Sequence, residues 1–370
     1  MRPIRCITAC VTLAVLALAG CGGNNNEPTS GASQAGASAS NAETYAVGGT
    51  VSGLHGEPLV LKNGSDSVTV SQDGPFSFPT RMATGNTYAV AIQNPFWTTC
   101  TSTNGNGTVS TNVTVSVTCV PMTNATITSV GGGYVSPAGV AVDGAGNVYV
   151  ADTGNDAIKE IAAGSATPTI LGSGFSAPSG VAVDRSGNVF VADTGNGAIK
   201  EIATGNATPT VLSSGFSLPA GVAVDAAGNI YLTDENANVV DRITAGGTLV
   251  TDVIPGFQAP IGIATDTAGY VYVADTDENV VTELAPDATA IANVGSGFAM
   301  PRGVAVDSEG NVYVADTGTN TVKRIAPDGV TVTTLATGFN EPYGVAVDSV
   351  GNVYVADKYN NAVKKLVPAP

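Results

Sequence analysis

The sequence predicts an all-β protein whose larger part is a six-bladed β-propeller, preceded by a small β-sandwich-like region. Two observations predict this fold class. A 41-residue period recurs six times after about residue 124, and short apolar runs separated by turn residues fill the rest of the chain. The 370 residues are 43% hydrophobic and only 12% charged, with 46 glycines. This composition suits strands joined by tight turns and does not suit a disordered chain.

The first segment has the composition of an export signal. Arg2 and Arg5 precede an apolar stretch over residues 7–19, which is about the length of a signal-peptide core. The small residues before Cys21 resemble a bacterial lipobox, so we expect residues 1–20 to be removed and Cys21 to carry lipid. An ordinary cleaved signal or a short uncleaved anchor is the alternative. Acyl chains would hold the protein on a membrane without a spanning helix, and no later segment reaches the ~20 apolar residues that spanning needs.

Residues 21–43 are rich in Gly, Asn, Ser and Ala and show no periodicity, which is typical of a flexible tether. Two cysteines follow, Cys100 and Cys119. In an exported protein an even pair favours a disulfide; two free buried thiols are the alternative.

The formal net charge of -16 disfavours nucleic acid as a partner, since like charges repel and the sequence has no Lys/Arg cluster. We expect a monomer in the bacterial cell envelope that contacts the membrane only through its lipid. Gly22 follows the cysteine where some bacteria use an aspartate to retain lipoproteins at the inner membrane, so the outer membrane is preferred.

Residues 44–120 are predicted to form the small sandwich, expected to be antiparallel, because short alternating runs are separated by turn pairs such as Asn63-Gly64 and Asp73-Gly74. His55 is the only histidine of the chain. Its turn-like surroundings predict an exposed polar residue with no role in chemistry.

Residues 124–370 are predicted to form the propeller, because a period of this length with β-type patterning is the mark of one blade per copy. Each copy carries one proline, a first aspartate and a second aspartate at fixed offsets. The prolines are Pro137, Pro178, Pro219, Pro260, Pro301 and Pro342. The first aspartates are Asp143, Asp184, Asp225, Asp266, Asp307 and Asp348, and the second are Asp152, Asp193, Asp234, Asp275, Asp316 and Asp357.

The two ends of the repeat predict how the ring closes. The last copy stops after its third strand, near Val367, whereas a strand-like run over residues 125–130 precedes the first copy. We therefore expect this N-terminal strand to pair within the last blade, which removes the open edges of a linear array.

The pattern Pro-x-Gly-Val-Ala-Val-Asp, followed by Gly-Asn-Val-Tyr-Val-Ala-Asp, resembles the NHL repeat family. The resemblance covers about two thirds of the chain and implies a propeller. It does not imply one function, because propellers of this type include binding modules, sensors and some lyases.

Aspartates present in every copy are expected to bond turn amides, so function is sought where the copies differ. The loops before each proline and after each second aspartate should meet on one face of the ring, called here the loop face. Blades five and six offer residue types enriched in binding surfaces, and blades three and four offer an acidic sector. The predicted binding residues are Met300, Arg302, Glu341, Tyr343, Lys358, Tyr359, Glu235, Asp277 and Glu278.

Enzymatic function is the weaker expectation, and no catalytic residue, metal ligand or cofactor is assigned. Lyases that resemble these propellers rely on histidines, and the predicted propeller has none. Lactonase-like propellers hold calcium with acidic and amide side chains at the channel, where the matching positions here include only Glu341 as an acid. A weak Ca²⁺ site at the acidic sector stays open.

The function predicted from the sequence is that of a membrane-tethered envelope protein that binds a protein or a glycan through the loop face. The alternative is a Ca²⁺-dependent hydrolase or lyase acting on a small periplasmic substrate. A third possibility is a structural spacer.

Overall fold

The structure is a computed structural model that describes residues 43–286 and 291–368. By its contacts, the chain from Glu43 to Pro370 forms one compact unit. The expected signal peptide, the lipidated Cys21 and the tether up to residue 42 lie outside the described residues. Within the described part, no helix has the length and apolar character to cross a membrane.

The N-terminal strands form two four-stranded sheets that share one core, with a further two-stranded pairing of β1 (Thr44–Tyr45) and β6 (Met82–Ala83). The first sheet has the order β5 (Gly74–Ser77), β2 (Val47–Ser52), β10 (Val113–Pro121), β8 (Thr98–Thr103). The second has the order β4 (Asp66–Val70), β3 (Leu59–Asn63), β7 (Thr87–Gln93), β9 (Asn106–Thr108). Buried side chains of both sheets, including Leu61 and Val117, lie in one cluster, so the region is the small sandwich that the sequence predicted.

The expectation of a wholly antiparallel sandwich was wrong at one pairing. β2 and β10 run parallel, with Val47 opposite Val113. Turn signals predict how neighbouring strands are joined, but they carry no information about the direction in which the first and the last strands meet. The predicted disulfide is confirmed, because Cys100 and Cys119 lie directly opposite each other on β8 and β10 and are bonded.

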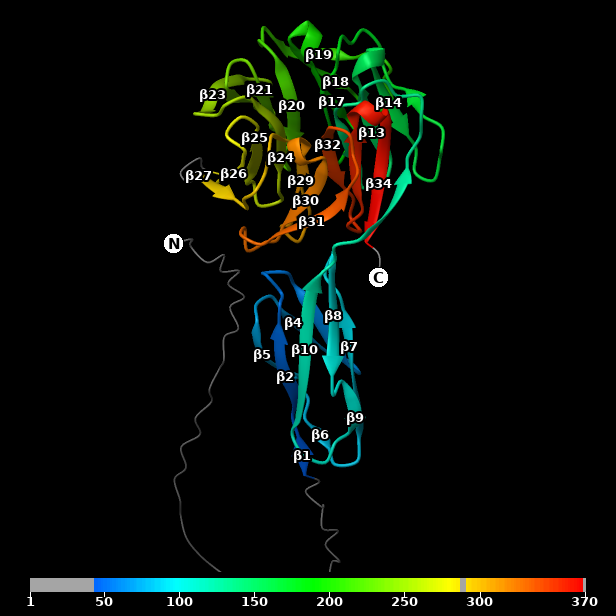
Figure 1. Cartoon of the computed structure of the whole chain (residues 1–370), viewed down its shortest axis with the longest axis vertical. Helices are drawn as coiled ribbons and strands as arrows, with labels where there is room; N and C mark the ends of the chain where they lie inside the picture. Colours follow the sequence, from blue (N-terminus) through cyan, green and yellow to red (C-terminus); the bar gives the residue numbers. More distant parts are fainter. Residues whose placement is uncertain (1–42, 287–290, 369–370) are drawn as a thin grey trace, which may run out of the picture. The chain divides into compact units, whose positions relative to one another are not determined.

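The propeller consists of six four-stranded sheets, confirming one blade per copy (Figure 1). Blade one is β12 (Val140–Val142), β13 (Val148–Asp152), β14 (Ala157–Ile161), β15 (Thr169–Ile170). Blade two is β16 (Gly180–Val183), β17 (Val189–Asp193), β18 (Ala198–Ile202), β19 (Thr210–Ser214). Blade three is β20 (Pro219–Val224), β21 (Ile230–Asp234), β22 (Val239–Ile243), β23 (Leu249–Pro255).

The remaining blades repeat this order. Blade four is β24 (Pro260–Thr265), β25 (Val271–Asp275), β26 (Val280–Leu284), β27 (Ile291–Val294). Blade five is β28 (Pro301–Val306), β29 (Val312–Asp316), β30 (Thr321–Ile325), β31 (Val332–Thr337). Blade six is β32 (Pro342–Val347), β33 (Val353–Asp357), β34 (Ala362–Pro368), β11 (Ala125–Ser129).

Blade six therefore takes its outermost strand from the start of the propeller, as the sequence predicted. β11 pairs antiparallel with β34, and Thr126 lies opposite Val367. Because the chain enters and leaves the ring in the same sheet, the backbone hydrogen bonds between β11 and β34 within blade six close the ring.

A ring of glycines lets the six innermost strands meet backbone to backbone. A Cβ added to any of them would lie closer than 3.0 Å to a carbonyl oxygen of the next blade. The six contacts are Gly139 with Ser179, Gly180 with Ala220, Gly221 with Ile261, Gly262 with Arg302, Gly303 with Tyr343 and Gly344 with Ala138. The last contact closes the circle. Close approach of backbone, and not turn geometry, is what requires glycine at this repeat position.

The first aspartate of each copy holds the tight turn between the two inner strands, as expected. Asp143 Oδ1 accepts the amides of Ala145 and Asn147, at 2.9 and 2.8 Å, and its Oδ2 accepts the Asn147 side-chain amide. The Oδ1 bonds recur in all six copies, for example at Asp307.

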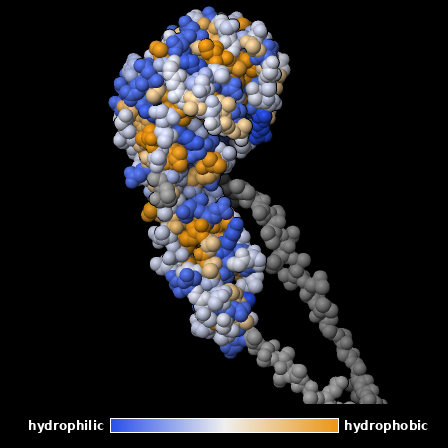
Figure 2. All heavy atoms as spheres, turned by 90° about the vertical axis from the view of Figure 1, so that its right-hand side faces the viewer, coloured by the Kyte–Doolittle hydropathy of each residue, from blue (hydrophilic) through white to orange (hydrophobic). Residues whose placement is uncertain are grey.

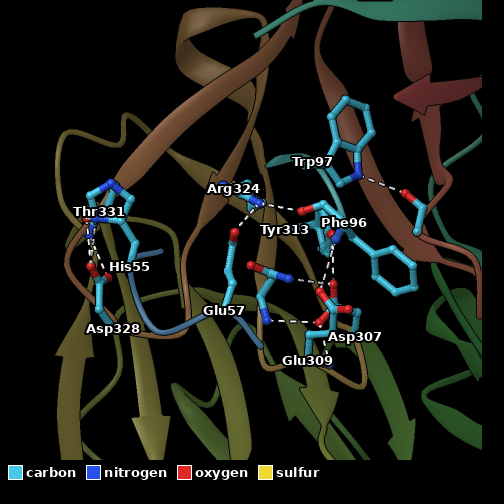
Figure 3. Close-up of polar contacts among 12 residues, drawn as sticks. His55, Glu57, Phe96, Trp97, Asp307, Glu309, Tyr313, Arg324, Asp328 and Thr331 are labelled. Carbon is cyan, nitrogen blue, oxygen red and sulfur yellow. Dashed lines mark hydrogen bonds and ion pairs between the residues drawn. The ribbon is translucent and has the colours of Figure 1, made fainter. Parts of the chain in front are cut away.

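The sandwich contacts the ends of blades five and six that lie opposite the loop face. We call this contact the seam (Figure 3). The fully buried Trp97 packs among side chains of both blades, including Tyr313 and Val353. His55 also lies at this contact, where its carbonyl accepts the amide of Asp328 of blade five at 3.1 Å while its side chain stays 38% exposed.

The surface alternates between hydrophilic and hydrophobic residues without one continuous apolar face in the view of the propeller in Figure 2. The large exposed apolar side chains are scattered through the sequence, from Val120 to Tyr359. Single exposed apolar residues are normal on a soluble surface.

Candidate binding site

The loop face is built by the register of the two inner strands. In blades three to six each repeat proline lies opposite the second aspartate, as in Pro301 with Asp316 and Pro342 with Asp357. The loop before the proline and the loop after the aspartate therefore begin side by side. Short 3-10 turns such as Thr317–Thr319 and Lys358–Asn360 follow the aspartate.

The second aspartates fix the loops before the prolines, as predicted. Asp152 accepts the amide of Val135 at 2.7 Å, and Asp357 accepts that of Asn340 at 2.7 Å. In blades one, two and five a lysine also neutralises this buried carboxylate, as in Lys159 with Asp152 at 2.6 Å. Blades three and four have Asp241 and Thr282 at the lysine position, which leaves the acidic sector without that cation.

Two of the predicted residues have their backbone held by a hydrogen bond from the preceding blade. Glu341 and Met300 precede the proline with positive φ of 51° and 48°. Their amides donate to Asn320 and Asn279 of the preceding blade, at 2.9 and 2.7 Å. Because the same bond orients both backbones, side chains at this position are presented at a defined place on the loop face.

The central channel under the loop face is narrow. Its cavity of about 60 Å³ is lined by the six glycines together with the residue on either side of each. This is far below the roughly 300–1,000 Å³ of a pocket that encloses a small organic ligand. A ligand larger than a few waters must therefore bind at the mouth of the channel and not inside it.

Arg302, Tyr343 and Lys358 form a cationic cluster at this mouth. The Arg302 guanidinium lies 5.0 Å from the centre of the Tyr343 ring, and Lys358 Nζ lies 4.3 Å from it. Arg302 and Tyr343 also line the channel itself. Both distances are below the roughly 6 Å within which the quadrupole of an aromatic ring attracts a cation.

Arg302 and Lys358 are incompletely compensated by neighbouring groups. Arg302 Nε is buried without a partner, and Arg302 Nη1 lies 3.7 Å from Glu341 Oε2, too far for a hydrogen bond. Burial lowers the pKa of Lys358, and the charge of Arg302 lowers it further. The cluster therefore keeps one donor, Arg302 Nε, without an acceptor among the described residues.

Two carboxylates face this cluster. Burial raises the pKa of Glu235, although the positive charges of Arg302 and Lys358 lower it in part. Burial also raises the pKa of Tyr343, with the negative charge of Glu235 adding to the effect. Arg302, Glu341, Tyr343, Lys358 and Glu235 thus influence one another across blades three, five and six, which brings five predicted binding residues together.

The other four predicted residues are more exposed, although the negative charge of Asp277 raises the pKa of Glu235 and so couples Asp277 to the cluster. The side chains of Met300 and Tyr359 are 46% and 54% exposed, and Asp277 and Glu278 are exposed. Beneath the latter pair, burial raises the pKa of Asp275 to about 6, and the charges of Glu278 and Asp277 raise it further.

The channel mouth does not offer the donor set of a calcium site. Its lining side chains are Ala138, Ser179, Ala220, Ile261, Arg302 and Tyr343, so the channel is lined by one guanidinium and by no carboxylate, whereas Ca²⁺ takes oxygen ligands. Over residues 43–286 and 291–368, no three His, Cys, Asp or Glu side chains gather in a metal-ligating group.

Sequence reasoning missed Ser179. It is 9% exposed and lowers the pKa of Tyr343 by hydrogen bonding. The sequence did contain a signal for it, since Ser179 is the one hydroxyl residue at its repeat position besides Tyr343.

A second recess, of about 440 Å³, lies at the opposite end of blades two to four. Its aspartates, Asp184, Asp225 and Asp266, already bond turn amides.

These features define a class: six-bladed propellers with a polar site at the loop-face mouth of a closed channel. The chain belongs to the Virginiamycin B lyase family, which it matches over residues 79–366. No curated protein matches the sequence. The resemblance to NHL repeats stays a prediction.

Solved structures share the fold at low identity. A streptogramin B lyase is 14% identical with a TM-score of 0.51, over 66% of this chain and 98% of that chain. A gluconolactonase from Xanthomonas campestris is 16% identical with a TM-score of 0.59, over 66% and 90%. A protein of unknown function from Bacteroides thetaiotaomicron is 15% identical with a TM-score of 0.58, over 84% and 90%.

Proposed function

We propose that this protein is a lipid-anchored envelope protein that binds an anionic group of a protein or glycan at the loop-face mouth of its propeller. The observation that carries the proposal is the convergence of Arg302 and Lys358 on Tyr343, with one guanidinium donor, Arg302 Nε, left without an acceptor in the described chain. A carboxylate would accept from both cations, and charge-assisted hydrogen bonds of this kind are the strong ones.

The small channel supports binding at the surface of the mouth. A group inserted between Arg302 and Lys358 would meet an apolar wall on the side of Ala138, Ala220 and Ile261. This pairing of a charged half with an apolar half suits an acidic group carried on a larger body. Cys21 would attach the protein to the membrane, with the outer membrane preferred.

The test is a pull-down from envelope extract combined with titration calorimetry using glucuronate and an acidic peptide as probes. We expect Arg302→Ala with Lys358→Ala to weaken binding at least tenfold, since a charged hydrogen bond contributes about 1.5–3 kcal/mol. Arg185→Ala is the matched control, because it removes one cation from an exposed position at the opposite end of the propeller. Equal binding by all three proteins would rule out the site.

A second candidate is a lyase or lactonase acting on a cyclic ester. It is favoured by the family and by the opposed pKa shifts of Lys358, which is lowered, and Glu235, which is raised. Groups whose pKa values are pushed toward neutrality are suited to general base and acid catalysis. The propeller has no histidine, so Lys358 would act as the base and Glu235 as the acid.

Turnover of glucono-lactone or a cyclic depsipeptide, with and without added Ca²⁺, distinguishes the two candidates. A rate that Lys358→Met abolishes would establish catalysis. Binding of an acidic probe without turnover would favour the binding protein.

A further inference from the structure

The seam between the sandwich and blades five and six places three carboxylates around one guanidinium. Arg324 and Glu57 are each 1% exposed, and Arg324 Nη1 lies 2.6 Å from Glu57 Oε1. Glu309 accepts the amide of Phe96 at 3.1 Å, and Asp307, 8% exposed, lies in the same turn as Glu309 (Figure 3).

The polar groups of the seam are incompletely paired. Arg324 Nη1 also donates to the Phe96 carbonyl at 2.8 Å, but Arg324 Nε and Nη2 are buried without acceptors among the described residues. Both Glu57 oxygens are buried without a hydrogen bond that meets the usual geometry. The interactions of these buried charges therefore do not fully offset the free-energy cost of removing them from water.

The other titratable groups that face the seam do not supply a second buried cation. Tyr313 donates its hydroxyl to Asp307 at 2.8 Å. His55 lies at the exposed rim, where Nδ1 is 3.7 Å from Asp328 Oδ2 and 3.3 Å from the Thr331 hydroxyl. With all three carboxylates ionised, the buried part of the seam carries an excess of negative charge.

We propose that the seam is a pH-dependent joint, which holds the sandwich on the propeller when one of the three carboxylates is protonated and loosens when all three are ionised. Glu309 is the group best placed to change state, because it lies between Asp307, Glu57 and the Phe96 amide and is less buried than the other two acids.

The direction of each titration agrees with this geometry. Burial raises the pKa of Glu309 to about 7, and the negative charges of Asp307 and Glu57 add to the effect. Burial also raises the pKa of Glu57 and of Asp307. An acid with a raised pKa in the docked form favours docking below the pKa of the free form. That preference is lost as the pH rises from about 4.5 to about 7.

Other copies show that Glu309 is specific to the seam. The same turn position holds Ala145, Ser186, Ala227, Ala268 and Val350 in the other blades. The turn itself needs no acid there, because the amide of Ala145 bonds Asp143 as the amide of Glu309 bonds Asp307. Glu309 is therefore explained by its contact with the sandwich and not by the repeat.

The chain contains a reporter for this joint. Trp97 is its only tryptophan, it is fully buried at the seam, and its indole N–H donates to the Gly351 carbonyl at 2.8 Å. Undocking would expose this ring, which red-shifts its emission and opens it to acrylamide.

The test is tryptophan emission and acrylamide quenching of the full-length protein between pH 5 and 8.5. We expect quenching to rise severalfold with a midpoint near pH 7 while the far-ultraviolet circular dichroism stays constant. Glu309→Gln should abolish this transition, and Glu201→Gln, an acid of blade two away from the seam, should leave it unchanged. Constant emission in the wild type, or an unchanged transition in Glu309→Gln, would overturn the proposal.

Two further measurements distinguish Glu309 from His55 and replace the Glu309 variant if it does not fold. His55→Gln should retain the transition, and its loss in that variant would assign the joint to the histidine instead. If Glu309→Gln fails to fold, hydrogen exchange of the Phe96 amide, corrected for its intrinsic pH dependence, should increase through the same range in the wild type. Uniform protection of that amide would contradict the proposal.

Discussion

Blades five and six end in two very different ways. At the loop face, Arg302, Tyr343 and Lys358 converge, with Arg302 Nε left without an acceptor among the described residues. At the opposite end, Arg324 and Trp97 are fully buried against the sandwich. The same repeat scaffold thus carries an open polar site at one end and an internal joint at the other. Function in this fold follows from which end is covered as much as from which residues the blades carry.

The largest effect should come from breaking the covered end. Trp97→Ala removes a fully buried indole and its bond to Gly351, so we expect a loss of about 3–5 kcal/mol in the free energy of unfolding. Urea unfolding followed by circular dichroism measures it. Tyr359→Ala, at the 54% exposed aromatic of the loop face, should stay within about 0.5 kcal/mol. Similar losses of stability for the two variants would contradict the difference between the buried end and the loop face.

The buried ion pair should give the next largest effect. At pH 5, where Glu309 holds its proton, Glu57→Gln removes the carboxylate that lies 2.6 Å from Arg324 Nη1, and breaking this buried pair costs about 3 kcal/mol or more. The double variant Glu57→Gln with Arg324→Met removes the charge as well, so it should be less destabilised than Glu57→Gln alone. Thermal and urea unfolding of the wild type, Glu57→Gln, Arg324→Met and the double variant form the cycle. Strict additivity would mean that the two side chains do not interact.

A smaller effect distinguishes architecture from binding at the open end. Asn320→Ala and Asn361→Ala each delete one bond between blades, to Glu341 and to Ser136. Both should lose about 1–2 kcal/mol of stability. Only Asn320→Ala should also weaken binding of an acidic probe, because it releases the backbone of the residue paired with Arg302. Equal weakening in both would place the site elsewhere.

The smallest effect concerns pH at the loop face. The pKa of Asp275 is raised to about 6 in the folded protein, mainly by burial, so its contribution makes stability fall as the pH rises from about 4 to about 6. Asp275→Asn keeps an acceptor for the Gln258 amide and should flatten the dependence in urea unfolding at pH 4.5 and 7.5. Glu278→Gln, at an exposed neighbour, should flatten it far less.

Much of the fold could be predicted because each copy of the repeat encodes one blade. Six identical spacings of proline and aspartate require six equivalent units, and the missing fourth strand of the last copy has one candidate partner near residue 125. The loops that differ between copies contained five residues that meet at the channel mouth. Met300, Tyr359 and Glu278 come from the same loops but do not join that cluster, and Asp277 reaches it only through its charge on Glu235, because loop position does not determine the direction of a side chain.

The sequence by itself determined the number of blades, the closing strand and the role of the repeated aspartates, since these follow from periodicity and local hydrogen bonding. It also indicated the disulfide, because only one pair of cysteines follows the expected signal and lipidation site. Only the tertiary structure decided the parallel pairing of β2 with β10 and the burial of Glu57, Trp97 and Arg324 in one seam. The physical reason is the range of the interaction. Turns and strand alternation are encoded over a few residues, whereas Trp97 meets Gly351 across 254 residues of chain, and no local pattern specifies that contact.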